Sequence, residues 1–367
     1  MASMRCATQT EPIAPRGKKF ILKLAPPETE HVSEREISEK EHLSKLSAAF
    51  DNKEKFILKD AVEKKHLKEL EELQKELASG EFKIDSQLKD GRTPLFVVVC
   101  NNNFPAVKFL VEKGANMEIK ENENGNTALM AAISLGYVEI TDYLIQKKAN
   151  IKAVNNNGNT IVHFAAICGN LAILKYAHEH ECDINQKDKE GNCAILFATG
   201  NNYEKVVEYL LEQDAEIDVI DSEKMSLLHV CIQHNRNKIL NLILCKSRKT
   251  INKYYGDYQT ALYWAASTDK FNSVFVLLKY GANPNLNDSL NHSPLFWAVF
   301  YQNFEMVEML IDYGADIHCR YRIGGLASIH GGYQSYGDSI LRTAMRRWTT
   351  SITDLIREKG GEDHREY

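Results

Sequence analysis

Few residues of this chain have the types and spacing that catalysis or metal binding requires. His178, His180 and Cys182 offer three metal ligands within five residues. On a helix, residues two apart point to different faces, so these side chains could not converge on one ion without unwinding. The paired glycines at 324–325 and 331–332 lack the following Gly-Lys-Ser/Thr that holds nucleotide phosphates and magnesium. The sequence therefore predicts no catalytic residue, no metal and no cofactor.

The composition argues against several classes of partner and compartment. Lys plus Arg total 45 against 50 Asp plus Glu, and the net charge of −5 favours neither nucleic acid nor an anionic membrane. The longest strongly apolar run, residues 93–100, is far shorter than the roughly 20 residues of a membrane span. The eight scattered cysteines form no C-x-x-C pair, which predicts neither a disulfide framework nor a zinc finger. We expect a cytoplasmic protein without membrane insertion, with the nucleus as the alternative.

Seven segments of the chain share one pattern. They begin at residues 91, 125, 158, 191, 224, 258 and 291, so the period is 33 or 34 residues. Each opens on a motif such as Gly91-Arg-Thr-Pro-Leu or Gly125-Asn-Thr-Ala-Leu, continues through small residues, and runs into a Val/Leu-x-x-Leu-Leu pattern. Such a period is typical of a repeat protein in which each unit buries its apolar face against the next.

This pattern resembles the ankyrin repeat over residues 88–320. The resemblance implies an all-α solenoid of helix-turn-helix repeats with β-hairpin loops. A Thr or Ser hydroxyl then caps the first helix of each repeat, and leucines of the second helix bury against the next unit. The expected caps are Thr93, Thr127, Thr160, Ser226, Thr260 and Ser293, and the equivalent leucines are Leu110, Leu144, Leu210, Leu277 and Leu310.

The flanks of the array differ from the repeats. Residues 1–32 are expected to form a disordered tail, and residues 33–87 a charged helical N-terminal cap. A dimerising coiled coil is the alternative for the second segment, although its apolar stripe lasts only about two heptads. Residues 321–336 are rich in Gly and Tyr and are expected to form an elongated hairpin loop, followed by a C-terminal capping repeat and tail at 337–367.

Some repeats depart from the family pattern. Repeat five has Lys224 in place of its glycine and Cys245-Lys-Ser-Arg-Lys-Thr in place of the closing Gly-Ala, which predicts a distorted turn with weaker contacts between repeats. His163 and His229 alone occupy the family's histidine position. Trp264 and Trp297 follow that position and are expected in the core, since large apolar side chains are most often structural.

The resemblance also implies where a partner would bind. In this family the variable, partner-facing positions are the hairpin tips and the two residues before the mid-repeat glycine. The partner-binding residues predicted in this way are Leu135, Ile167, Gln233, His234, Phe300 and Tyr301. For Phe300 and Tyr301 two interpretations stay open: an exposed aromatic anchor for a partner, or partial burial under the 321–336 loop.

The function that follows is a non-catalytic scaffold or adaptor, which binds a partner protein through the hairpin tips and the concave inner-helix face. Two alternatives remain. One is an enzyme with an unrecognised site in residues 320–367. The other is a tether to a small dynein light chain, because Thr8-Gln9-Thr10 resembles the Thr-Gln-Thr segments that this light chain binds as an added edge strand.

Overall fold

The computed structural model describes residues 65–75, 78–79, 83–256, 259–288, 291–321, 338–347 and 350–361. The chain divides into two compact units, whose described parts are residues 65–194 and 195–361. Within the described residues, no helix is both long and apolar enough to cross a membrane. Thr8, Gln9 and Thr10 lie outside these ranges, as do residues 1–32 and most of the predicted 321–336 loop.

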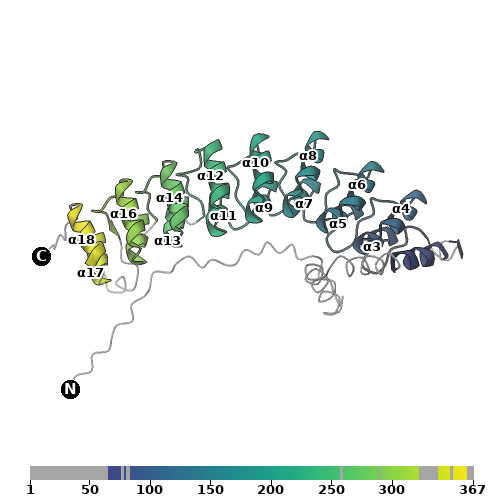
Figure 1. Ribbon diagram of the computed structural model, residues 1–367, viewed down its shortest axis with the longest axis horizontal. Coiled ribbons are helices and arrows are strands. Elements are labelled where there is room, and N and C mark those ends of the chain that lie inside the picture. The colour runs from purple at the N-terminus through teal and green to yellow at the C-terminus, as the bar shows by residue number, and fades with distance from the viewer. Residues whose placement is uncertain are drawn as a thin grey trace, which may run out of the picture. The chain divides into compact units, whose positions relative to one another are not determined.

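The first unit is built from pairs of short helices. An inner row and an outer row of helices lie side by side (Figure 1). The inner helices pack on one another from repeat to repeat, and each also packs on the outer helix of its own pair. The inner helices are α3 (Pro94–Cys100), α5 (Ala128–Ser134) and α7 (Ile161–Cys168), and the outer helices are α4 (Phe104–Glu112), α6 (Val138–Gln146) and α8 (Leu171–Glu179).

The second unit repeats this arrangement and adds one helix pair beyond the seven repeats. Its inner helices are α9 (Ala194–Gly200), α11 (Leu227–Gln233), α13 (Ala261–Ser267), α15 (Pro294–Phe300) and α17 (Ile340–Arg346). Its outer helices are α10 (Glu204–Glu212), α12 (Asn237–Lys246), α14 (Phe271–Lys279), α16 (Phe304–Asp312) and α18 (Thr350–Glu358). The last pair, α17 and α18, packs on α15 and α16, as expected of a capping repeat. The all-α solenoid class is confirmed.

Two short strands enclose the predicted loop insertion. Strand β1 (Arg320–Tyr321) pairs antiparallel with β2 (Asp338–Ser339), with Arg320 opposite Ser339 and Tyr321 opposite Asp338. The described ends of the segment are therefore joined as a hairpin would join them. The residues between the strands lie outside the described part of the chain.

Hydroxyl caps explain where the inner helices begin. The Thr93 side chain accepts a hydrogen bond from the backbone N–H of Phe96 at 3.2 Å, which satisfies one of the amide groups that a helix N-terminus leaves unpaired. In α7 the contact runs through the imidazole, because Nδ1 of His163 accepts from the Thr160 N–H at 3.1 Å and lies 2.9 Å from the Thr160 hydroxyl. As at Thr93, the side chain of each remaining predicted cap accepts from the backbone N–H three residues on. These caps are Thr127, Ser226, Thr260 and Ser293, and Ser339 caps α17 in the same way.

The core follows the predicted register. Leu110, Leu144, Leu210, Leu277 and Leu310 are completely buried, each with a relative exposure of 0%. They occupy equivalent positions in α4, α6, α10, α14 and α16. Neighbouring outer helices pack on one another, so these leucines help to bury the apolar face that no single repeat can cover.

Repeat five has the altered turn that its sequence predicts. Helix α12 runs to Lys246 and is followed by Ser247 in an extended conformation, and Lys224 takes a positive φ of 62° where the first four repeats have glycine. The weaker contacts expected for this repeat stay a prediction. Helix α12 packs on α10 and α14, and Lys246 forms an ion pair with Asp214 at 2.8 Å. Charged side chains therefore link repeat five to its neighbour.

The described part of the predicted N-terminal cap is helical over residues 65–75. It contacts the first repeat through Asn103, whose side-chain amide donates to the backbone oxygen of His66 at 3.1 Å and to Oε2 of Glu69 at 2.9 Å. The same Asn103 caps α4 through its oxygen, which accepts from Ala106. The buried Asn103 thus joins the helical segment to repeat one, in agreement with a capping role.

Candidate protein-binding surface

The hairpin tips of the first unit are tied together by their backbones. In each case a tip N–H donates to the backbone oxygen of the preceding tip, at 2.7 to 2.9 Å. The donors are Asn122, Asn156 and Lys189, and the acceptors are Asp90, Asn124 and Asn157. These tips approach so closely that a Cβ on Gly158, at φ +84°, would lie 2.9 Å from the backbone nitrogen of Lys189. The tips therefore form one connected edge.

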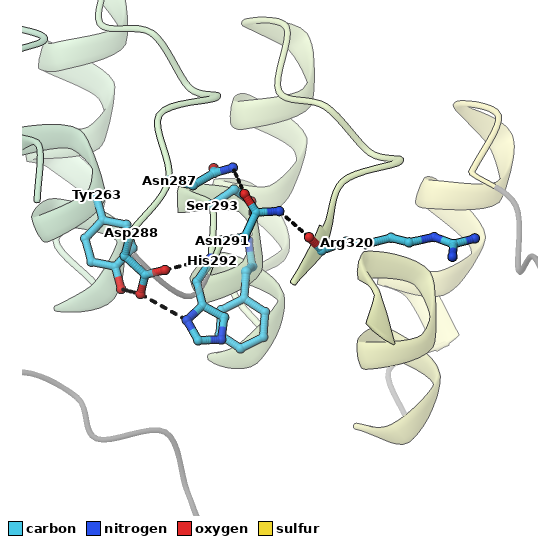
Figure 2. Close-up of polar contacts among 8 residues, drawn as sticks. Tyr263, Asn287, Asp288, Asn291, His292, Ser293 and Arg320 are labelled. Carbon is cyan, nitrogen blue, oxygen red and sulfur yellow. Dashed lines mark hydrogen bonds and ion pairs between the residues drawn. The ribbon is translucent and has the colours of Figure 1, made fainter. Parts of the chain in front are cut away.

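Side chains, in place of these backbone bonds, hold a tip of the second unit. Figure 2 shows Tyr263 and His292 pointing toward Asp288. Oδ2 of Asp288 accepts from the Tyr263 hydroxyl at 2.8 Å and lies 3.0 Å from Nδ1 of His292, and Oδ1 accepts from the His292 backbone N–H. Burial alone would raise the pKa of Asp288, but the hydrogen bonds from His292 and Tyr263 outweigh it and the pKa is lowered.

The same tip reaches strand β1. The side-chain amide of Asn291 donates to the backbone oxygen of Arg320, and its oxygen accepts from Asn287 (Figure 2). The His292 ring stacks on Phe296, with the ring centroids 4.4 Å apart. Hydrogen bonds through Asp288 and Asn291 thus link this tip to Tyr263 of α13 and to strand β1.

The predicted partner-binding residues lie at the ends of the inner helices, and the structure exposes them unequally. Leu135 is 37% exposed and lies near Val138, which is 60% exposed at the start of α6. Ile167, Gln233 and His234 are half-buried. Burial, together with the nearby Arg236, lowers the pKa of His234. The first unit thus presents apolar side chains at these positions, and the second presents polar and aromatic ones.

Phe300 and Tyr301 are half-buried, and contacts within the protein hold both. The Tyr301 hydroxyl donates to the backbone oxygen of Ser267 at 3.0 Å, and its ring stacks on Trp297. The guanidinium of Arg347 lies over the Phe300 ring, 3.8 Å from its centroid. The pair is therefore partly buried and partly exposed. Among the described residues, Arg347 of the capping repeat covers part of Phe300.

Sequence reasoning missed Arg347. The signal was present, because Arg346 and Arg347 follow the cap Ser339 at the same distances at which Phe300 and Tyr301 follow the cap Ser293. Of the two tryptophans predicted to lie in the core, one is fully buried and the other is half-buried. Trp297 is buried with 2% exposure, whereas Trp264 is half-buried, its ring edge-to-face with the buried His229.

The segment that contains His178, His180 and Cys182 was considered above as a source of metal ligands. Nδ1 of His180 lies 2.8 Å from the backbone oxygen of Tyr176, on whose ring the imidazole stacks. The Cys182 thiol points to the backbone oxygen of Ile151, and burial raises its pKa. Among the described residues, no group of three or more His, Cys, Asp or Glu side chains is placed to hold a metal ion.

Comparison with known proteins agrees with this geometry. A family model described as ankyrin repeats (3 copies) matches residues 58–155, 149–221 and 228–321, which together are more than half of the chain. The chain belongs to the ankyrin-repeat family. Repeats of this family generally mediate protein–protein interaction.

Several curated proteins resemble parts of the ankyrin array. The Notch-regulated ankyrin repeat-containing protein of Xenopus tropicalis is 35% identical over 91 residues, which are 25% of this chain and 79% of that protein. BRCA1-associated RING domain protein 1 of Caenorhabditis elegans is 39% identical over 70 residues, 19% of this chain and 10% of that protein. Ankyrin repeat and SAM domain-containing protein 6 of Mus musculus is 40% identical over 62 residues, 17% and 7% respectively. The chain spans a tenth or less of the length of the last two.

Proposed function

We propose that this ankyrin-repeat protein is a non-catalytic scaffold or adaptor of the cytoplasm. Its partner is a protein, which binds along the hairpin tips and the inner-helix ends. The tips supply a connected backbone edge, and the inner-helix ends supply side chains that differ from repeat to repeat. A constant framework with variable side chains is the arrangement by which repeat proteins recognise different partners.

One observation carries this proposal: the buried residues that hold the array together are distinct from the exposed apolar side chains Leu135 and Val138. The leucines of the outer helices and the cap hydroxyls are buried, whereas Leu135 and Val138 expose apolar surface to water. Exposed apolar side chains that the fold does not need are typical of interaction sites. Such side chains can change without loss of the fold, which is what specific recognition requires.

The test is photo-crosslinking from single positions of the full chain. A photoreactive amino acid at Leu135 or His234 should capture a partner protein from a cell extract. The same amino acid at Glu208, exposed on the outer helix α10, is the matched control and should capture none. Equal capture from Glu208, or capture from Glu208 alone, would place the binding site on the outer face and contradict the proposal.

A further inference from the structure

The last inner helix of the second unit differs in charge from the inner helices before it. Helices α11, α13 and α15 carry no Lys, Arg, Asp or Glu. Helix α17 carries Arg342 and Arg346, and Arg347 follows as its C-terminal cap residue. Positive charge on this inner row therefore gathers at the capping repeat, next to the aromatic end of α15.

The position of Arg347 leaves its hydrogen-bonding edge available. Its guanidinium contacts the Phe300 ring with the Cζ atom 3.8 Å from the ring centroid. A guanidinium stacked on a ring uses its face, and its N–H donors stay in the plane at the edge. Within the described part of the chain, the Arg347 side chain contacts the Phe300 ring and forms no hydrogen bond or ion pair. The contact with Phe300 thus positions Arg347, and its fork of donors, which fits a carboxylate, has no bond among the described residues.

The ring beneath Arg347 is itself fixed. The Phe300 centroid lies 5.4 Å from that of Tyr301, 5.7 Å from Trp297 and 6.1 Å from Phe296. The carboxylate of Asp269, in the preceding repeat, has a hydrogen-bond partner of its own. It accepts from the side-chain amide of Asn303 at 2.9 Å. A site whose side chains are held before binding loses less entropy when a ligand arrives.

We propose that Phe300, Tyr301 and Arg347 form an arginine–aromatic patch that binds an acidic peptide segment of the partner protein. A carboxylate of that segment pairs with the edge of the Arg347 guanidinium, and an adjoining apolar side chain contacts the exposed part of Phe300 and Tyr301. The inference rests on the proposed function and specifies the chemistry of the partner. A protein segment fits better than nucleic acid, because a nucleic-acid surface carries basic residues along a stripe and this chain has a net charge of −5.

The probe is a fluorescent octapeptide of alternating Glu and Leu, measured by fluorescence anisotropy with the full chain. A matched Gln/Leu peptide should bind about tenfold more weakly, since a hydrogen bond between a guanidinium and a carboxylate is stronger than one to a neutral amide. The Arg347→Lys variant keeps the charge but loses the planar fork, and should also bind about tenfold more weakly. Arg357→Lys is the matched control on α18, where Arg357 pairs with Asp354 at 3.8 Å, and should bind as the parent does.

Several outcomes would overturn the inference. They are unchanged binding by Arg347→Lys, equal binding of a Lys/Leu peptide, and displacement of the Glu/Leu peptide by single-stranded RNA at lower concentration than by unlabelled peptide. Thermal unfolding of each variant separates loss of binding from loss of fold. If crosslinking from Leu135 and His234 still captures a partner while the patch fails these tests, the scaffold function stands and the acidic-peptide site falls. If no position captures a partner, the scaffold proposal itself fails.

Discussion

At the scale of single residues, burial decides how the histidines of the array behave. His229 is 3% exposed, and Nδ1 of its ring lies 2.7 Å from the Ser226 hydroxyl. Burial disfavours the charged imidazolium, so the pKa of His229 falls from 6.5 to about 4, although a hydrogen bond to the backbone of Thr260 opposes the change. The pKa of His163, in the equivalent position, is lowered for the same main reason.

This gives a prediction on pH and stability. As the pH falls below 6.5, His229 becomes protonated in the unfolded chain, whereas in the folded chain it stays neutral until about pH 4. The free energy of unfolding should therefore be highest above pH 6.5 and fall as the pH drops toward 4, by up to about 3 kcal/mol from this residue. Urea unfolding at pH 7 and pH 4.5 measures the loss, and the difference should be smaller in His229→Gln. An equal difference in the variant would show that other groups cause it.

At the scale of elements, the tips and the outer helices depend on different physics. A tip in the first unit needs glycine both for its positive φ and for the close approach of the next tip, as Gly158 shows. Gly114 has a similar φ of +90°, but a Cβ there would meet nothing within 4 Å. A side chain at Gly114 would therefore cause backbone strain alone, whereas one at Gly158 would cause both backbone strain and a steric clash.

Replacing each of these glycines with alanine tests the separation. Both variants should lose about 1–2 kcal/mol from the left-handed conformation. Gly158→Ala should lose about 1 kcal/mol more, because the Cβ pushes against Lys189 and weakens the hydrogen bond from its N–H to Asn157. Hydrogen exchange of the Lys189 amide should accelerate in Gly158→Ala and stay unchanged in Gly114→Ala. Equal losses of stability in the two variants would show that the tips do not press on each other.

The outer helices give a second prediction at this scale. On α14, Leu277 is 0% exposed and Phe275 is 45% exposed, so one helix offers a buried residue and its control. Leu277→Ala should lower the free energy of unfolding by about 2–5 kcal/mol through the cavity it leaves. Phe275→Ala should change it far less. Chemical denaturation measures both, and a similar small effect of the two would contradict the register of the repeats.

At the scale of the whole molecule, an array stabilised by contacts between neighbouring repeats spreads a local defect. Within the second unit, α14 packs on α12 and α16. Leu277→Ala should therefore reduce hydrogen-exchange protection in α12 and α16 more than in α18, which packs on α16 but not directly on α14 within the described contacts. Uniform loss of protection across the unit would indicate that it unfolds as one cooperative body.

The capping repeat also contacts one member of the aromatic pair Phe300 and Tyr301 in the repeat before it. Arg347 belongs to the capping repeat, yet it covers Phe300 of the repeat before it. Phe300→Ala together with Tyr301→Ala therefore removes contacts within the fold as well as surface for a partner, including the hydroxyl bond from Tyr301 to Ser267. Thermal unfolding should show a lower melting temperature for this double variant. An unchanged melting temperature would mean that the pair serves binding alone.

The sequence by itself determined the repeat register, the cap hydroxyls and the buried leucines. These features depend on residues close together in the chain: a hydroxyl bonds an amide three positions on, and helical spacing places apolar residues on one face. Only the tertiary structure decided that Arg347 lies on Phe300, that Asp288 lies between Tyr263 and His292, and that Lys246 of repeat five pairs with Asp214. Apart from the pair Asp288–His292, which lies within one loop, those contacts join side chains from different repeats, and long side chains reach partners that no local spacing specifies.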